Sequence, residues 1–207
     1  MSTISRLAVV ALAGFAPALL AGSAWAQGPA STAGPFDTPL AKVITCAACH
    51  GVNGNSRSDA MPIIAGMDAA YIKKQVESYA AGKRPSPEMG PYAKQILDIG
   101  VDQVAAYFAG QKMEPTPIKP DPAAVERGRV AAAECVVCHG PAGKGDPARG
   151  IASLAGQAPG YLRDQIQLFK QDARNPGDAG LAAMKALMKT VPNERIPDLA
   201  AYYSSLR

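Results

Sequence analysis

The 207-residue sequence predicts an all-α protein that consists of two tandem domains. Apolar residues recur at helical spacing, and no stretch shows the sustained alternation that is typical of a β-strand. A long internal repeat opens with the motif Cys46–Gly51, which returns 89 residues later as Cys135–Gly140. A repeat of this length indicates a duplicated domain. We therefore expect domains at 27–109 and 123–207, joined by a proline-rich linker at 110–122.

The two copies stay in register after the motif, and the offset grows from 89 to 95 because the second copy gains six residues. The aligned residues are Ala65-Gly66 with Ala155-Gly156, Tyr71 with Tyr161, Gln75 with Gln165, Arg84 with Arg174, Met89 with Met184, Lys94 with Lys189, and Ala105-Ala106-Tyr107 with Ala200-Ala201-Tyr202. Between the copies, four prolines within 110–122 favour a stiff, extended segment that does not join either core easily.

Local signals place the helices of each copy. Asp68 is a good N-cap and Gly82 a good stop, which predicts a helix between them. The matching helix of the second copy begins at Pro159, because proline suits the first helical turn. We expect final helices near 102–109 and 197–206, and short helices at 40–46 and 124–135 before each cysteine motif. Domains this small bury little surface, so a bound group should complete each core.

Residues 1–26 read as an export signal rather than as part of the fold. Arg6 precedes an apolar run from Leu7 to Ala21, and Ala24-Trp25-Ala26 is a small-x-small cleavage site. We expect cleavage after Ala26 and no membrane span in the remaining chain, since the run is short for a bilayer. An uncleaved N-terminal anchor is the alternative. An exported chain enters an oxidising compartment, where thiols tend to be paired or ligated.

Composition excludes several classes of function. The hydrophobic fraction of 48% and the charged fraction of 18% are those of a globular protein. A net charge of +4, with no Lys/Arg run, argues against nucleic-acid binding. The chain has only two histidines, which excludes any site that needs several imidazoles.

The repeated motif Cys-x-x-Cys-His is the attachment signature of c-type haem. Cys46 and Cys49, or Cys135 and Cys138, would form thioethers to the haem vinyl groups, and His50 or His139 would bind the iron. The two motifs account for every cysteine and histidine in the chain. A zinc site would need cysteine pairs that lie closer together in the sequence. Thioredoxin-like exchange would need a strand-helix context, which is absent. Disulfides within the motifs would leave both histidines unexplained. An iron–sulfur cluster would require the two pairs to converge.

The distal iron ligand follows by elimination, which leaves methionine, lysine, tyrosine or an open site. Among the methionines after residue 26, only Met89 and Met184 align with each other across the repeat, and each lies 18 residues before a final-helix tyrosine. We therefore predict that they are the distal ligands, with Met61 and Met188 as rivals. Methionine ligation raises the reduction potential. A filled iron has no place for oxygen or peroxide, which favours a carrier over a catalyst.

A backbone carbonyl should orient each histidine. Pro62 lies where its carbonyl can accept from the free ring nitrogen of His50, which would raise the basicity of the ligand. Ala152 takes the equivalent place for His139 and lacks the fixed backbone of proline. We therefore expect the two haems to differ in potential.

These motifs resemble those of the two-haem class I cytochromes c, of the cytochrome c4 type. The resemblance rests on both Cys-x-x-Cys-His-Gly motifs, on the segments around Ala65-Gly66 and Ala155-Gly156, and on the late methionines before an Ala-Ala-Tyr helix. It implies two packed class I cytochrome c domains, two covalently bound haem c groups, and electron transfer in the periplasm, commonly toward a terminal oxidase. Ala152 departs from the family, which has proline there.

Three functions remain open from the sequence. The leading hypothesis is a periplasmic dihaem electron carrier that is not itself an enzyme and has redox proteins as partners. The second is a haem subunit of a periplasmic dehydrogenase complex, because the dihaem subunit of flavocytochrome c sulfide dehydrogenase has a similar fold. The third is a dihaem enzyme with an open haem iron. The sequence leaves the donor, the acceptor and the oligomeric state undetermined.

Overall fold

A computed structural model describes residues 38–207 of the chain. The predicted signal peptide, with its cleavage site, lies outside the described residues. Within residues 38–207 there are helices and loops but no strand, apart from one isolated antiparallel bridge between Asp146 and Ile151. The predicted all-α class is therefore confirmed.

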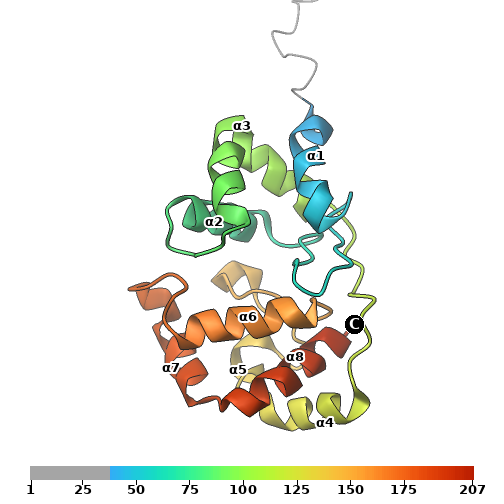
Figure 1. Ribbon diagram of the computed structural model, residues 1–207, viewed down its shortest axis with the longest axis vertical. Helices are drawn as coiled ribbons and strands as arrows, with labels where there is room; N and C mark the ends of the chain where they lie inside the picture. The colour runs from blue at the N-terminus through green and yellow to red at the C-terminus, as the bar shows by residue number, and fades with distance from the viewer. Residues whose placement is uncertain (1–37) are drawn as a thin grey trace, which may run out of the picture. The chain divides into compact units, whose positions relative to one another are not determined.

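The first half of the described chain contains three helices, α1 (Pro39–His50), α2 (Ala69–Ala80) and α3 (Met89–Ala109) (Figure 1). The Asp68 side chain accepts a hydrogen bond from the Tyr71 amide at 2.8 Å, which confirms it as the N-cap of α2. Gly82, just past the end of α2, has a φ of 68° and stops the helix as expected. The core of this half is apolar and is made by Val43, Ile72, Val76, Ala93, Ile96, Val101, Val104, Ala105 and Phe108.

Helix α3 is longer than predicted and is kinked. Gly100 has φ 111° and ψ 83°, a conformation open to glycine, so the segment is two helical pieces on either side of it. The second piece is the predicted helix at 102–109. The first piece was not predicted, and its second and third residues are Gly90 and Pro91. Both are tolerated there, since the amides of a first turn have no partner within the helix.

The second half contains α4 (Pro122–Ala131), α5 (Val136–His139), α6 (Pro159–Lys170), α7 (Ala182–Thr190) and α8 (Ile196–Ser205). Three short 3₁₀ turns, Pro147–Arg149, Ala179–Leu181 and Asn193–Arg195, lie between them. The helix expected at 124–135 ends early, at Ala131, and a separate turn leads into the cysteine motif. Helix α7 was not predicted. The core here is Ala132, Leu162, Leu199, Ala200 and Tyr203.

Helices α4 and α8 cross closely at Gly128. A Cβ at that position would lie 1.9 Å from the carbonyl oxygen of Asp198, so only glycine fits the crossing. Beside it, the Asp198 carboxylate accepts two hydrogen bonds from Arg127 Nε, at 3.0 and 3.1 Å, and one from Nη2 at 2.8 Å. This charged pair fastens the first helix of the second half to the last.

The segment at 110–122 is extended between the two halves but is tied to both of them. In the first half, Asn55 Oδ1 accepts from the Glu114 amide at 2.8 Å, and Asn55 Nδ2 donates to the Lys112 carbonyl at 2.9 Å. Toward the second half, the buried Thr116 donates its amide to the Gly156 carbonyl at 2.8 Å. The segment is therefore held to each half by hydrogen bonds, although proline-rich composition does not favour joining either core.

No helix between residues 38 and 207 combines the length and the apolar character needed to cross a bilayer.

Candidate functional site

Each half presents its cysteines and histidine on one helical turn. Cys46, Cys49 and His50 lie in the last turns of α1. In the second half, Cys135 is the N-cap residue of α5, and Cys138 and His139 are the last two residues of that helix. Residues three apart on a helix share a face, so both thiols of a pair can reach one flat group. The first cysteine of each pair is half-buried and the second exposed, and no disulfide joins them. Burial raises the pKa of Cys46 and of Cys135.

The two histidines are oriented by the predicted carbonyls. His50 Nδ1 lies 2.8 Å from the Pro62 carbonyl oxygen, and His139 Nδ1 lies 3.0 Å from that of Ala152. A carbonyl can only accept, so Nδ1 carries a proton in both rings, and in the neutral ring Nε2 keeps its lone pair. Burial lowers the pKa of His50 and of His139, which the carbonyl contacts partly oppose. Both imidazoles are thus neutral bases with Nε2 available to a metal.

The predicted methionines lie at matching places in the two halves. Met89 is the first residue of α3 and packs against the core of the first half. Met184 is in the first turn of α7 and is half-buried. Its rival Met188 is buried one turn later on the same face of α7, and Met61 lies in the loop before Pro62. The assignment of the distal ligands stays a prediction.

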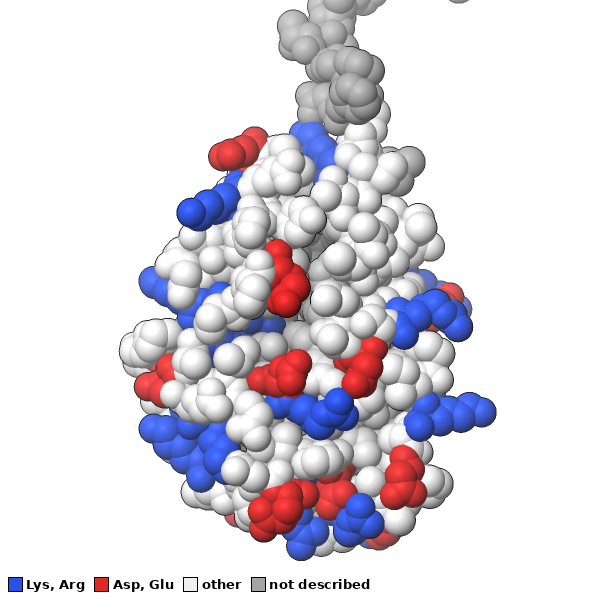
Figure 2. Space-filling view, viewed as in Figure 1, with Lys and Arg blue, Asp and Glu red and all other residues white. Residues whose placement is uncertain are grey.

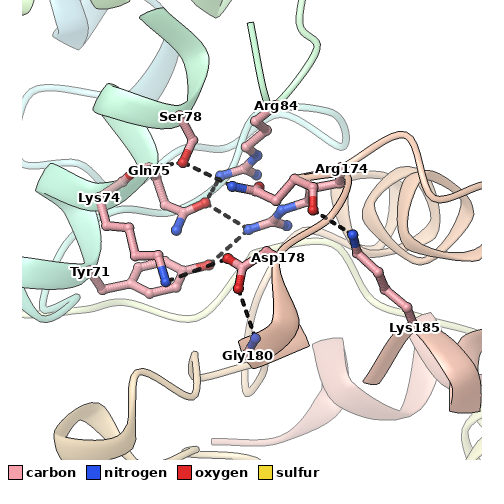
Figure 3. A network of polar contacts seen from close by, with 10 residues as sticks. Tyr71, Lys74, Gln75, Ser78, Arg84, Arg174, Asp178, Gly180 and Lys185 are labelled. Atoms are coloured by element: carbon pink, nitrogen blue, oxygen red, sulfur yellow. Dashed lines mark hydrogen bonds and ion pairs between the residues drawn. The ribbon is translucent and has the colours of Figure 1, made fainter. Parts of the chain in front are cut away.

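The tyrosine, glutamine and arginine that recur 90 residues apart in the two copies meet at the contact between the halves (Figure 3). Arg84 Nη2 donates to Tyr161 Oη at 2.9 Å and to Gln165 Oε1 at 2.8 Å. In return, Arg174 Nη2 donates to Tyr71 Oη at 3.1 Å and to Gln75 Oε1 at 2.8 Å. Two hydrogen bonds within the halves complete the network. Arg84 Nη1 donates to Gln75 Oε1 at 2.8 Å, and Arg174 Nη1 donates to Gln165 Oε1 at 2.7 Å.

The same symmetry extends to the aromatic rings beside the arginines. The Arg84 guanidinium lies 4.4 Å from the ring centre of Tyr79, and Arg174 lies 4.4 Å from that of Phe169. Both contacts are of the cation–π type. Burial would raise the pKa of Tyr161, but Arg84 and Arg174 outweigh it and lower that pKa. These repeated residues align the two copies in the sequence, and their role as an interface was not predicted.

The two arginines carry buried charge without a carboxylate. Arg84 is 3% exposed and Arg174 is 5% exposed. Within residues 38–207 neither forms an ion pair, and the Nε atom of each is buried without a hydrogen-bond partner. A buried cation is costly unless an anion compensates it. Haem carries carboxylates of its own, so the two buried arginines and the Cys-His turns both fit the predicted cofactor.

A second contact between the halves joins Asp59 to the start of α6. Asp59 Oδ1 accepts from the Gly160 amide at 2.7 Å, and the Asp59 carbonyl accepts from the Tyr161 amide at 2.8 Å. Asp59 Oδ2 also pairs with Arg163 at 2.9 Å. The N-cap residue of α6, Ala158, makes no side-chain cap, so Asp59 of the first half caps a helix of the second.

Other candidate chemistry is weakly represented. No group of three or more His, Cys, Asp and Glu side chains that could hold a metal ion occurs in the described part of the chain. On the face shown in Figure 2, lysine and arginine are interspersed with aspartate and glutamate. That face shows no single-sign stripe of the kind that binds nucleic acid.

Comparison with known proteins gives consistent matches. The cytochrome c family profile matches residues 125–207. The cytochrome c4 of Pseudomonas aeruginosa is 32% identical over 187 residues, which cover 86% of this chain and 92% of that protein. The thiosulfate dehydrogenase electron acceptor of Stutzerimonas stutzeri is 32% identical over 79% of each chain.

A solved structure matches the fold. The crystal structure of reduced recombinant cytochrome c4 from Pseudomonas stutzeri superposes with a TM-score of 0.73 at 30% identity, over 84% of this chain and 100% of that one. The predicted fold of two tandem class I cytochrome c domains is therefore confirmed.

Proposed function

We propose, from the premise that the chain belongs to the cytochrome c4 family, that it is a periplasmic electron carrier and not itself an enzyme. As a dihaem electron-transfer cytochrome it binds two haem c groups covalently. The signal at residues 1–26 supports the periplasmic location, and domains at 27–109 and 123–207 would each hold one haem. The carrier would take electrons from a periplasmic dehydrogenase and pass them to a terminal acceptor such as an oxidase.

The observation that carries this proposal is the matched geometry of the two Cys-His turns. Cys46 and Cys49 would form the thioethers of the first haem, and His50 would bind its iron through Nε2. Cys135, Cys138 and His139 would do the same for the second haem. Met89 and Met184 would supply the distal sulfur atoms.

The chain's own residues favour rapid electron transfer over substrate chemistry. When bound, each haem supplies an iron that changes oxidation state by one electron. The carbonyls of Pro62 and Ala152 hold the two imidazoles in one orientation through Nδ1, so the protein ligands need not rearrange. A sulfur ligand on the other side would exclude oxygen and peroxide.

Arg84 and Arg174 would hold haem carboxylates at the contact between the domains. Their Nε atoms are buried without partners, and their positive charge is balanced by no acidic side chain in the described range. Carboxylates supplied by the cofactor would satisfy both requirements. Because each arginine also bonds to the other domain, the two haem sites would share one set of charges.

A ligand-binding titration separates a carrier from an enzyme. The reduced holoprotein is mixed with carbon monoxide, and the ferric protein is examined for a sulfur-to-iron charge-transfer band. A carrier with both irons filled should bind no carbon monoxide without denaturation and should show the band for both haems. Stoichiometric binding of carbon monoxide would instead identify an open iron and refute the carrier.

A second candidate function is that of a dedicated acceptor for one dehydrogenase. It is favoured by relatives named thiosulfate dehydrogenase electron acceptor, one of which is 32% identical to this chain. A dedicated acceptor should co-purify with a dehydrogenase and be reduced by it at limiting concentration. A free carrier should bind transiently and be reduced comparably by several donors.

A further inference from the structure

We propose that Gln157, in the second domain, is a positioning residue that tunes the haem of the first domain. The proposal rests on the proposed function, because it takes His50 to be the iron ligand of that haem. It concerns a contact between the domains that reaches the ligand through one peptide group, the peptide between Pro62 and Ile63.

Gln157 holds Ile63 from both sides of its backbone. Its Oε1 accepts from the Ile63 amide at 3.0 Å, and its Nε2 donates to the Ile63 carbonyl. Gln157 is 3% exposed and Ile63 is 1% exposed, so no solvent competes for these bonds. Paired contacts of this kind fix the position of the Ile63 backbone relative to the second domain.

The Ile63 amide belongs to the same peptide group as the carbonyl that His50 contacts. The N–H of this peptide group, from Ile63, donates to Gln157 Oε1 at 3.0 Å. The C=O of the same group, from Pro62, accepts from His50 Nδ1 at 2.8 Å. Hydrogen bonds in series polarise one another, so the bond to Gln157 makes the Pro62 carbonyl a stronger acceptor. A stronger acceptor at Nδ1 raises the basicity of the imidazole and favours the oxidised iron. Gln157 should therefore lower the potential of the first haem.

The contact has no counterpart in the other direction. The repeat places Met67 opposite Gln157 and Ser153 opposite Ile63. A thioether cannot donate a hydrogen bond, so Met67 cannot hold Ser153 as Gln157 holds Ile63. The bond from His139 to the Ala152 carbonyl is also longer, at 3.0 Å. The second domain thus adjusts the first haem, whereas the first domain lacks this means of adjusting the second.

The test is Gln157→Met, which gives the second copy the residue of the first. In a redox titration of the holoprotein, the ratio of oxidised to reduced first haem at a fixed potential should fall about two- to threefold, a rise of about 20–30 mV at 59 mV per tenfold. The second haem should keep its potential. In the NMR spectrum of the reduced protein, the His50 Nδ1 proton should move upfield, because its hydrogen bond weakens.

Two further variants separate tuning from loosened docking. Ser78→Ala removes the bond from Asn175 Nδ2 to Ser78 Oγ, a neutral contact between the domains that does not touch the 62–63 peptide. It should leave both potentials unchanged. Gln157→Glu keeps an oxygen that accepts from Ile63 and should leave the first potential at or below that of the parent. Equal shifts of both haems, or the same shift in Ser78→Ala, would overturn the proposal.

The parent protein gives an independent test if Gln157→Met does not fold. Its His50 Nδ1 proton should resonate downfield of the His139 Nδ1 proton and exchange more slowly, and the reverse order would overturn the proposal. Failure of the underlying site looks different, because a protein without iron-bound His50 shows no haem-shifted ring signals for that residue in any variant.

Discussion

Replacing Gly160 by alanine tests the contact that joins the two domains at the start of α6. A Cβ at this position would lie 2.5 Å from Asp59 Oδ2 and 2.7 Å from the Asp59 carbonyl oxygen. The carboxylate can rotate away, but the backbone oxygen cannot. Asp59 must therefore move and lose its bonds to the amides of Gly160 and Tyr161.

The steric term outweighs the helix propensity of alanine. Alanine in a helix is favoured over glycine by at most about 1 kcal/mol. Overpacking at a tight contact costs about 1–3 kcal/mol, and loss of an N-cap costs about 1 kcal/mol. The ion pair with Arg163 is half-exposed and adds little. We expect a net loss of about 1–3 kcal/mol, or a fall in Tm of about 2–12 °C for a chain of this size.

Gly90→Ala is the matched control. Gly90 is the second residue of α3, as Gly160 is of α6, and a Cβ there would meet nothing within 4 Å. This variant should be as stable as the parent or more stable, by up to about 1 kcal/mol. Thermal unfolding of both holoproteins, followed by circular dichroism, measures the difference. Shifts of the same sign in the two variants would refute the interdomain cap.

Three further predictions concern the haem sites and acid stability. Met89→Ala and Met184→Ala should each keep the covalent haem but lower one potential, and two normal potentials in the double variant would refute the ligand assignment. Arg84→Gln should lower at least one potential in a redox titration, because a haem carboxylate loses its counter-charge. The Arg127 guanidinium lowers the pKa of Asp198, so this carboxylate stabilises the fold above its ordinary pKa of about 3.9 and ceases to do so as pH falls through the lowered value. Urea unfolding at several pH values should therefore show a shallower acid decline for Asp198→Asn, and an unchanged decline would count against this pair.

Local signals in the sequence were enough to predict the helical repeat and the proximal side of each site. The cap at Asp68, the stop at Gly82 and the carbonyls of Pro62 and Ala152 were all found where expected. Each depends on residues close in the chain or fixed by the motif. Helix α7 and the first part of α3 were missed, because neither has a side-chain cap at its N-cap residue.

Contacts between the domains could not be predicted from one copy at a time. Arg84 and Gln165 are 81 residues apart, and nothing local indicates that they meet. A signal was nevertheless present, because tyrosine, glutamine and arginine recur together at one offset, and a symmetric contact between the copies requires the same residues in both. Ala158 and Gly160 were a second signal, since a helix start with no cap of its own needs a partner from elsewhere.

The most direct test is the intact mass of the exported protein under denaturing conditions, which removes all but covalently bound groups. We predict the mass of residues 27–207 plus two haems, falling to one haem when Cys46 and Cys49 are both replaced by serine. A mass equal to the bare polypeptide, from cells that mature other c-type cytochromes, would contradict the account.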